Sequence, residues 1–436
     1  MSNHIRRRPP LAALVTLTAL ATVLAGCGTV DNSKGGGGGT SGGGQVTLWT
    51  HNAGNPQELG VVNQIVSDFN ASQTKFKVVV QAFPQASYND AVVAAATAKK
   101  LPCLLDIDAP NVPNWAYAGY LAPLDLPQDL VSKNLPSTLG NYQGKLYSIG
   151  YYDAALGLFA HKSALEAAGA RVATIDKPYT ADEFNTLLSK IKSAAKYQTA
   201  FDLGTGDTGT EWWTYGYSPF LQSFGGDLID RSTYQTAKGV INGDKALAWA
   251  SWFQGLVKQG YTPAKSSPDA FADFVNGKSA MVWSGIWNSS NLDKVKDGVV
   301  MPPPDFGTGA KIGGGSWQWG VSSGCNKQDG ALEYLKFSLN TKYLSQFAQK
   351  QSVIPATEDA AAITPGWQSG GPKRFFLDLS KKDALIRPPT PGYPFLTTTF
   401  AKAAQDIIAG GEPKKILDQA ASDIDENLKS NDNYGF

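Results

Sequence analysis

The sequence QVTLWTH, Gln45–His51, followed by PQELGVVNQIVSDFNAS, Pro56–Ser72, decides the fold. The first segment predicts a β-strand. The second segment predicts an amphipathic helix, because apolar residues recur in it at helical spacing, at Leu59, Val62, Ile65, Val66 and Phe69. A strand that leads directly into a helix is the repeating unit of an α/β domain.

The same unit repeats further along the chain. FKVVVQAF (Phe76–Phe83) predicts a second strand, YNDAVVAAATAKK (Tyr88–Lys100) a second helix, and PCLLDIDAP (Pro102–Pro110) a third, buried strand. Such alternation implies a parallel sheet, and ligands of these sheets collect at the carboxyl ends of the strands. The polar residues that follow the three strands are therefore candidate ligand contacts: His51, Asn52, Gln85 and Asp108.

The central part of the chain continues the α/β pattern. Gly144–Gly169 predicts a strand pair that leads into a helix, and Thr180 with Glu183 forms a capping-box pattern at the start of the next helix. Gly209–Asp230 predicts a tryptophan-bearing loop and a helix closed by two glycines. Asp269–Asn288 predicts a helix, a glycine turn and a buried strand, and the tail from residue 328 is expected to be largely helical.

The N-terminus predicts export. A basic MSNHIRRRPP and an apolar LAALVTLTALATVLAG form a secretory signal peptide over residues 1–26, which is excluded from the fold. LAGC, Leu24–Cys27, resembles the bacterial lipobox, in which the cysteine carries a diacylglycerol anchor; an ordinary signal peptide with a chance cysteine is the alternative. Residues 27–44, with Cys27 and a glycine-rich run, predict a lipidated, flexible tether.

Composition excludes several classes of protein. Without residues 1–26, which hold three arginines and no acid, 35 basic residues stand against 37 acidic ones, so nucleic-acid binding is not expected. No second apolar stretch is long enough to span a membrane. Only His51 and His161 remain after processing, and no zinc or serine-hydrolase motif is present. We therefore expect no metal, no cofactor and no catalytic residue.

One stretch resembles a known family with the greatest specificity. FVNGKSAMVWSGIW, Phe274–Trp287, is similar to the Phe-x-x-Gly-x-x-Ala-Met and following Gly-x-Trp pattern of extracellular solute-binding protein family 1. These are the maltose-binding-protein-type sugar-binding proteins of ATP-binding-cassette importers. Other similar stretches follow in the family's order over nearly all of residues 45–430, among them VTLWTHN, YAGYLAPLDL and FLQSFGGDLID.

The resemblance implies an α/β fold of two lobes, joined by crossing hinge strands, with the ligand in the cleft between them. The expected first lobe comprises residues 45–155 and 320–365. The expected second lobe comprises residues 156–319 and 366–436. Both lobes together hold about 390 residues, enough for two substantial cores.

Aromatic side chains are expected to stack on the C–H faces of a sugar. Trp287 aligns with the tryptophan that members of the family stack on their ligand. Trp283 lies on the predicted strand, so either ligand contact or core packing is open to it. Trp317, beside Gly315 on an inter-lobe strand, is a further candidate.

Polar partners follow from strand position for Asp108, where an unpaired buried acid would be costly, and from the resemblance for the others. Asp108 is expected to bind ligand hydroxyls, with a helix cap as the alternative, and Asp153 either does the same or forms a salt bridge at the hinge. Glu211, Trp212 and Trp213 belong to a loop that brings an acid and an aromatic ring to the second lobe. Arg387 and Tyr393, in IRPPTPGYPF, lie where the family approaches its cleft, although proline-rich packing also explains them.

The two remaining cysteines, Cys103 and Cys325, form either a disulfide or two separate buried thiols. The resemblance assigns them to strands of the same lobe and favours the disulfide.

The function implied is capture of a mono- or small oligosaccharide outside the cytoplasmic membrane. The partners implied are the sugar and the membrane subunits of an importer, with the chain itself a monomer. Two alternatives stay open. One is a secreted glycoside hydrolase in which Asp108, Asp153 and Glu211 converge, and the other is a surface sugar-binding lipoprotein that is not coupled to transport.

Overall fold

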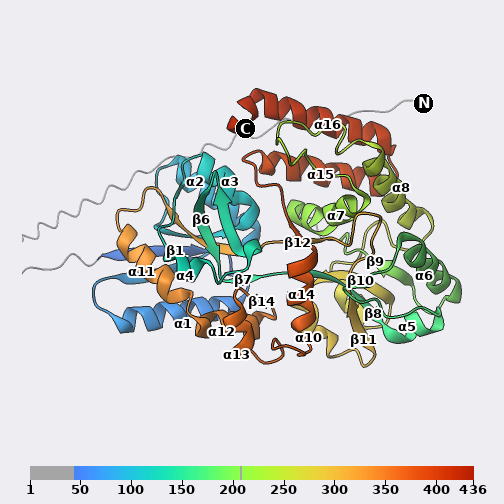
Figure 1. Ribbon diagram of the computed structural model, residues 1–436, viewed down its shortest axis with the longest axis horizontal. Helices are drawn as coiled ribbons and strands as arrows, with labels where there is room; N and C mark the ends of the chain where they lie inside the picture. Colours follow the sequence, from blue (N-terminus) through green and yellow to red (C-terminus); the bar gives the residue numbers. More distant parts are fainter. Residues whose placement is uncertain (1–43, 207–208) are drawn as a thin grey trace, which may run out of the picture. The chain divides into compact units, whose positions relative to one another are not determined.

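The computed structural model describes residues 44–206 and 209–436. Within them lie two main β-sheets, each with its own buried hydrophobic cluster (Figure 1). The two-lobed α/β fold expected from the sequence is therefore correct. The signal peptide, Cys27 and nearly all of the tether lie outside the described residues.

The first sheet has the strand order β2-β1-β3-β13-β6-β5, with β4 paired to β13. Its strands are β1 Gln45–Thr50, β2 Lys77–Ala82, β3 Leu104–Asp108, β4 Leu121–Ala122, β5 Leu139–Tyr142, β6 Lys145–Gly150 and β13 Trp317–Ser322. The first three strands are parallel, as the sequence predicted, but β13 is antiparallel to both β3 and β6. The sheet is mixed because a strand from far along the chain returns to its centre.

Seven helices of the described residues belong to this part of the molecule. They are α1 Pro56–Ser72, α2 Gln85–Thr97, α3 Val112–Tyr117, α4 Gln128–Val131, α11 Gln328–Ser338, α12 Thr341–Gln351 and α13 Glu358–Ile363. Helix α1 begins at a proline after the cap Asn55, whose side chain accepts from the Glu58 backbone N–H. Its buried face differs from the expected one at one turn, since Leu59 is only partly covered and Glu58 is buried instead.

The second sheet has the order β11-β8-β10-β9. Its strands are β8 Leu156–His161, β9 Thr199–Asp202, β10 Ser279–Gly285 and β11 Gly298–Met301. Its helices are α5 Lys162–Ala167, α6 Ala181–Ala194, α7 Thr210–Phe224, α8 Asp244–Lys258, α9 Ala270–Val275, α10 Ser289–Leu292, α14 Arg374–Asp383, α15 Tyr393–Ile408 and α16 Pro413–Ser430. Figure 1 shows α15 and α16 side by side next to α7 and α8.

Local signals in this half are largely as predicted. The capping box of Thr180 and Glu183 is present at the start of α6, and Gly225 ends α7 in the left-handed conformation. One expectation was wrong: the segment with Glu211 and its two tryptophans is the first turn of α7, not a loop. The helix begins earlier than predicted, which fixes these three side chains on a rigid element.

Two short ribbons lie where the chain passes between the sheets. Strand β7 Tyr152–Asp153 pairs with β14 Ile354–Pro355, and β12 Ile312–Gly314 pairs with β15 Ala384–Ile386. The chain returns to the first sheet at Trp317, the first residue of β13. The sequence predicted that the first lobe would resume at residue 320, three residues later.

A disulfide joins Cys103 to Cys325 in the structure. Cys103 precedes β3 and Cys325 follows β13, so the bridge links the ends of two adjacent antiparallel strands. Among residues 44–206 and 209–436, no helix combines the length and the apolar character needed to cross a bilayer.

Candidate functional site

One side of the candidate site forms at one edge of the first sheet, where β1 and β3 end and β13 begins. His51 follows β1 and stacks on Trp317, with ring centroids 3.5 Å apart and planes 8° from parallel. Trp317 in turn pairs in register with Asp108, the last residue of β3. The parallel-sheet rule thus brought together two of the residues it selected, His51 and Asp108, around a tryptophan from a distant strand.

A buried hydrogen-bond network fixes the His51 ring. Its Nδ1 lies 2.6 Å from the Asp106 carboxylate, which also accepts from the hydroxyls of Thr50 at 2.9 Å and Tyr151 at 3.1 Å. The same hydroxyl oxygen also lies 3.1 Å from the Glu58 carboxyl group. Burial alone would lower the pKa of His51, but the nearby carboxyl groups, Asp106 first and then Glu58 and Asp108, together outweigh it, so the pKa is raised. The pKa of Glu58 is also raised, chiefly by burial.

In the part of the chain that the structure describes, the side-chain amide of Asn52 lacks hydrogen-bond partners. Its side chain is 1% exposed, and among the described residues neither its amide oxygen nor its amide nitrogen has a hydrogen-bond partner. An unsatisfied buried amide costs about 1–3 kcal/mol. The arrangement therefore favours a polar group from outside the chain next to Asn52.

Three aromatic rings form the other side of the site, here named the aromatic wall: Trp212, Tyr215 and Trp287. The Trp287 ring lies 6.3 Å from Trp212 and 6.4 Å from Tyr215, measured between centroids. It is 42% exposed, unusually high for so large a ring. The ring lies directly over Gly285, where an added Cβ would come within 2.1 Å of it. Only glycine permits this close approach.

The Trp212 indole is held in place by hydrogen bonds. Its N–H points to the Gly204 carbonyl oxygen at 3.1 Å and to the Tyr217 hydroxyl at 3.0 Å. Of the three consecutive α7 residues considered from the sequence, Glu211 and Trp212 are partly exposed, whereas Trp213 is buried in the core.

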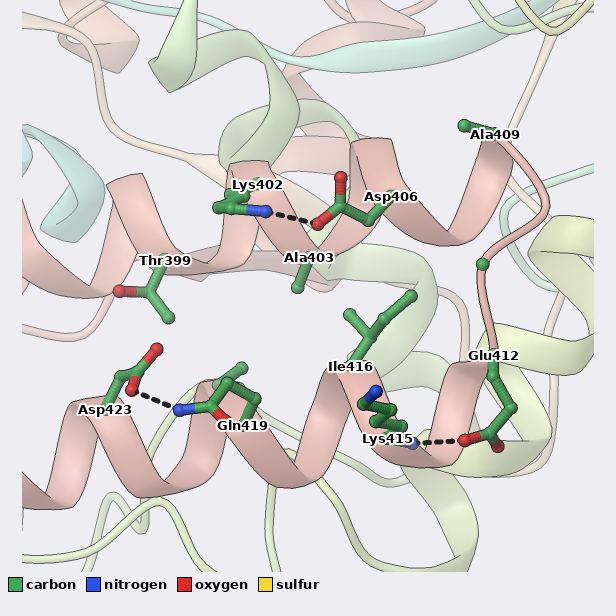
Figure 2. Close-up of a pocket in the computed structure, with 12 residues that line it drawn as sticks. Thr399, Lys402, Ala403, Asp406, Ala409, Glu412, Lys415, Ile416, Gln419 and Asp423 are labelled. Atoms are coloured by element: carbon green, nitrogen blue, oxygen red, sulfur yellow. Dashed lines mark hydrogen bonds and ion pairs between the residues drawn. The ribbon is translucent and has the colours of Figure 1, made fainter.

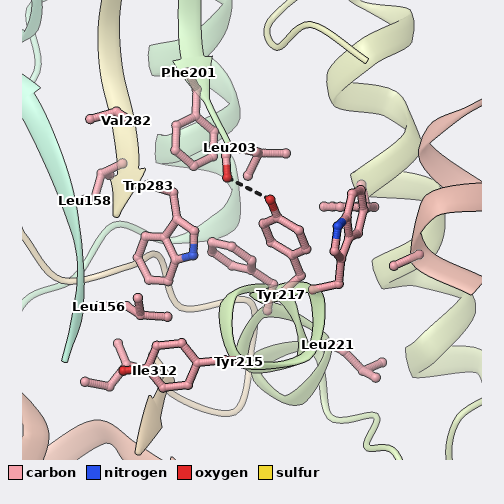
Figure 3. Packing of buried hydrophobic residues seen from close by; sticks show 14 of the residues in the cluster. Leu156, Leu158, Phe201, Leu203, Tyr215, Tyr217, Leu221, Val282, Trp283 and Ile312 are labelled. Atoms are coloured by element: carbon pink, nitrogen blue, oxygen red, sulfur yellow. Dashed lines mark hydrogen bonds between the residues drawn. The ribbon is translucent and has the colours of Figure 1, made fainter. Parts of the chain in front are cut away.

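Trp283 belongs to the core of the second sheet. It is 1% exposed, and its indole N–H donates to the Gly216 carbonyl oxygen at 2.8 Å. Figure 3 shows the ring among Leu156, Leu158 and Val282. Of the two roles left open for Trp283, its burial within β10 and its hydrogen bond to α7 support core packing.

Arg387 connects residues of the two halves. Its guanidinium forms an ion pair with Glu211 of α7, lies 3.7 Å from the Asp108 carboxylate at the end of β3, and covers the Tyr215 ring at 4.9 Å. The hydroxyl of Tyr393 donates to Glu211 at 2.8 Å. Arg387 is buried, and although burial would lower its pKa, the two carboxylates raise it.

Asp108 is the residue on which these two sides meet. Burial raises its pKa to about 7; the nearby Arg387 opposes that shift and Glu211 adds to it. The alternative role considered for Asp108, a helix cap, is not present, since its side chain makes no capping hydrogen bond.

Three other expected residues lie differently. Asp153 is fully buried and accepts from the hydroxyls of Ser137 at 2.7 Å and Ser380 at 2.8 Å, which gives it a structural role in the crossing segment. Gln85 is exposed at the first residue of α2. Gly315 has a left-handed φ of 88°, and a Cβ there would lie 3.7 Å from Arg387.

Sequence reasoning missed Asp106, Glu58 and Tyr215. A period of two places Asp106 on the same face of β3 as Asp108, so this signal was available. Glu58 resembled an ordinary acid in the first turn of a helix, and Tyr215 resembled a core residue. No local pattern identified either one.

A separate groove lies between α15 and α16 (Figure 2). Most of its charged side chains are already paired: Lys402 with Asp406, Asp423 with Gln419, and Glu412 with the Lys415 backbone N–H. None of the residues discussed above lines it. It is therefore not the candidate site.

Comparison with known proteins gives three kinds of similarity. Residues 64–372 match the family described as bacterial extracellular solute-binding protein. The diacetylchitobiose binding protein DasA of Streptomyces coelicolor is 24% identical over 364 residues, which cover 80% of this chain and 82% of that protein.

Solved structures share the fold. The GacH receptor of Streptomyces glaucescens, whose structures include complexes with acarbose, has a TM-score of 0.72 and 22% identity over 89% of this chain and 98% of its own. The cyclic α-maltosyl-1,6-maltose binding protein of Arthrobacter globiformis has a TM-score of 0.73 and 22% identity over 88% and 99%. The sugar-binding protein MalE of Xanthomonas citri has a TM-score of 0.73 and 17% identity over 88% and 98%.

Proposed function

The chain belongs to the bacterial extracellular solute-binding proteins, and from that premise we propose that it captures a small carbohydrate and delivers it to the permease of an ATP-binding-cassette importer. The family is the one that the Phe274–Trp287 stretch resembled. Support for a carbohydrate comes from the relatives that bind diacetylchitobiose, acarbose or maltose-type sugars.

The observation that carries the proposal is the exposed Trp287 ring of the aromatic wall. A large, rigid ring face packs well on the C–H face of a sugar and loses little conformational entropy when it binds. In an ordinary surface position a tryptophan this exposed has no stabilising role. The neighbouring Tyr215 lies against Arg387, which in turn faces Asp108, so the site offers an apolar plane together with the charged groups that sugar hydroxyls bind.

We assign ligand contact to Trp287, Trp212 and Trp317 as stacking or edge surfaces. Asp108, Glu211 and Arg387 bind hydroxyl groups, and Asn52 forms hydrogen bonds through its amide. His51 supports Trp317 from behind through the stack at 3.5 Å. Closure of the two halves on the sugar, with the two crossing ribbons as the hinge, follows the hinge mechanism common to two-lobed binding proteins.

We propose that the protein binds the sugar without cleaving it. The competing possibility is glycoside hydrolysis. A retaining glycosidase needs one carboxyl as acid and a second as nucleophile, about 5 Å apart. Here Asp108 and Glu211 both face the same buried guanidinium, and Asp153 is occupied by two serine hydroxyls. Incubation with the bound sugar should release no product; appearance of hydrolysed sugar at a rate proportional to protein would support the rival.

The direct test is a thermal-shift screen of the purified protein against maltose, acarbose and N,N′-diacetylchitobiose. A ligand that binds only the folded state raises the melting temperature. We expect at least one sugar to do so, with a saturable calorimetric titration to match. A flat response to all three sugars and to a wider carbohydrate panel contradicts carbohydrate capture.

We also propose that Cys27, outside the described residues, anchors the protein by a lipid at the extracellular face of the membrane. The Cys27→Ser variant should then leave the membrane fraction or remain unprocessed. Equal membrane retention of the variant and the parent protein contradicts the anchor.

A further inference from the structure

The guanidinium of Arg387 is already engaged by groups of the protein. One arm pairs with Glu211, the other lies 3.7 Å from Asp108 and 3.5 Å from the Gly314 carbonyl oxygen, and the flat face covers the Tyr215 ring. Its Nε is buried, and within the described part of the chain it has no partner. Two carboxyl groups therefore flank the end of the guanidinium and its Nε is covered, so neither of the paired N–H edges that a carboxylate would take is open to a ligand.

The groups that already surround the Arg387 guanidinium restrict the charge that a ligand can carry there. A carboxylate or phosphate binds arginine best through two parallel hydrogen bonds, which need two free N–H groups. An acidic ligand at Arg387 would have to displace Glu211 or Asp108. The displaced carboxylate would then lose its counterion beside the buried Arg387 side chain, which is unfavourable.

The surrounding charges point the same way. Two acidic groups, Asp108 and Glu211, face one guanidinium, so above the Asp108 pKa of about 7 negative charge exceeds positive charge there. The neighbouring His51 does not restore the balance, since it is paired with Asp106 and has Glu58 at 3.9 Å. A hydroxyl or an ammonium group suits these surroundings, whereas another negative charge is repelled.

We infer that the site accepts neutral and amino sugars and excludes acidic sugars, with Glu211 and Asp108 as the residues that set this selectivity. The inference rests on the proposed function, because it specifies which class of carbohydrate the same site takes. It needs no knowledge of the natural sugar.

The experiment compares sugars that share one skeleton. Calorimetric titration would use maltose against maltose oxidised to a glucuronate at C6 of its non-reducing unit. It would also use N,N′-diacetylchitobiose against its free diamine, chitobiose. We expect the acidic sugar to bind about a hundredfold more weakly than its neutral parent or worse, because like charges at an interface are strongly disfavoured. The diamine should bind at least as well as its parent.

The outcomes separate the two claims. Binding of the acidic sugar within about threefold of maltose, or to the exclusion of maltose, overturns the inference and leaves carbohydrate capture standing. If neither these sugars nor any member of the wider carbohydrate panel binds, carbohydrate capture fails and the inference falls with it. If only the chitobiose pair binds, the acidic comparison is made with diacetylchitobiose carrying a C6 carboxylate.

A variant of Glu211 tests whether this residue causes the discrimination against acidic sugars. Glu211→Gln keeps the shape and frees one arm of Arg387, so the ratio of acidic to neutral dissociation constants should shrink at least about tenfold. The matched control is Glu358→Gln, which removes a carboxylate paired with Arg374 at 2.9 Å on α13, and should leave the ratio unchanged. An unchanged ratio in Glu211→Gln, with a normal melting curve, contradicts the role of Glu211.

Discussion

At the scale of single residues, Trp283 and Trp287 show how much position decides. They stand four residues apart, yet Trp283 is 1% exposed and Trp287 is 42% exposed. Trp283 lies inside β10, where one face of the strand packs on α7. Trp287 follows the end of that strand, so its backbone turns away from the core. The same residue type thus stabilises the fold at one place and is free for a ligand at the other.

Replacement of each tryptophan should separate these roles. Trp287→Ala should change the free energy of unfolding by less than about 1 kcal/mol and weaken sugar binding strongly. Trp283→Ala should cost about 3–5 kcal/mol because it leaves a cavity in the core. Urea melts and calorimetric titration of both variants check this. Undiminished affinity in folded Trp287→Ala would remove that residue from the site.

Asp108 gives a prediction in pH. Its folded-state pKa of about 7 is above the usual value, mainly through burial, so the folded protein holds this proton more tightly than the unfolded chain does. Its contribution to stability therefore falls as pH rises from about 4 to about 7. Asparagine has no such proton. As the pH is raised from 5 to 8, wild type should therefore lose stability that Asp108→Asn keeps. The free energy of unfolding of the variant, measured relative to wild type, should rise by about 1–2 kcal/mol over this range. Urea melts across this range measure it, and a difference that is constant with pH contradicts it.

At the scale of elements, the ribbon of β12 and β15 determines where the site residues meet. Gly313 of β12 packs against α7 so closely that an added Cβ would lie 2.5 Å from the Tyr215 ring and 2.7 Å from the Tyr215 carbonyl oxygen. Tyr215 in turn supports Arg387, which follows β15. The spacing between ribbon and helix is thus set by a glycine.

Gly313→Ala should cost about 1–3 kcal/mol of stability, since backbone as well as side-chain atoms would have to move. It should also weaken sugar binding, because the Tyr215 ring is displaced. Gly255→Ala on α8 is the matched control. A Cβ there meets only the flexible end of Gln259 at 3.4 Å, so this variant should gain about 0.5–1 kcal/mol. Equal melting temperatures for the two variants would contradict the close packing of β12 on α7.

At the scale of the whole molecule, the chain returns to the first sheet only after it has built the second. Strand β13 enters between β3 and β6, and the Cys103–Cys325 disulfide closes a separation of 222 residues there. A cross-link over so long a loop restricts the unfolded chain strongly. The bridge therefore stabilises the pairing that depends most on distant parts of the sequence.

The Cys103→Ser/Cys325→Ser variant should lose about 2–4 kcal/mol of stability, with sugar affinity unchanged while the protein is folded. A reducing agent should lower the melting temperature of the wild type and leave that of the variant unaffected. Trapping of free thiols before mass spectrometry of the unreduced protein should find neither cysteine alkylated. Two alkylated cysteines would contradict the bridge.

The sequence alone determined the elements whose signals are local. The β1–α1 unit, the capping box of α6 and the glycine end of α7 depend on neighbours within a few residues, which the sequence displays directly. The resemblance around Phe274–Trp287 added the two-lobed fold. It also selected Asp108, Glu211, Trp287 and Arg387 as site candidates, and the structure gathers these about Arg387 and Tyr215.

Only the tertiary structure decided which of these residues meet. Arg387 pairs with Glu211 across 176 residues, and His51 is stacked on Trp317 of a strand that joins the first sheet late. The burial of Trp283, the serine partners of Asp153 and the network of Asp106 with Glu58 likewise have no local signature. The physical reason is that burial and pairing are set by which distant segments pack together. Periodicity and capping report only how each segment folds on itself.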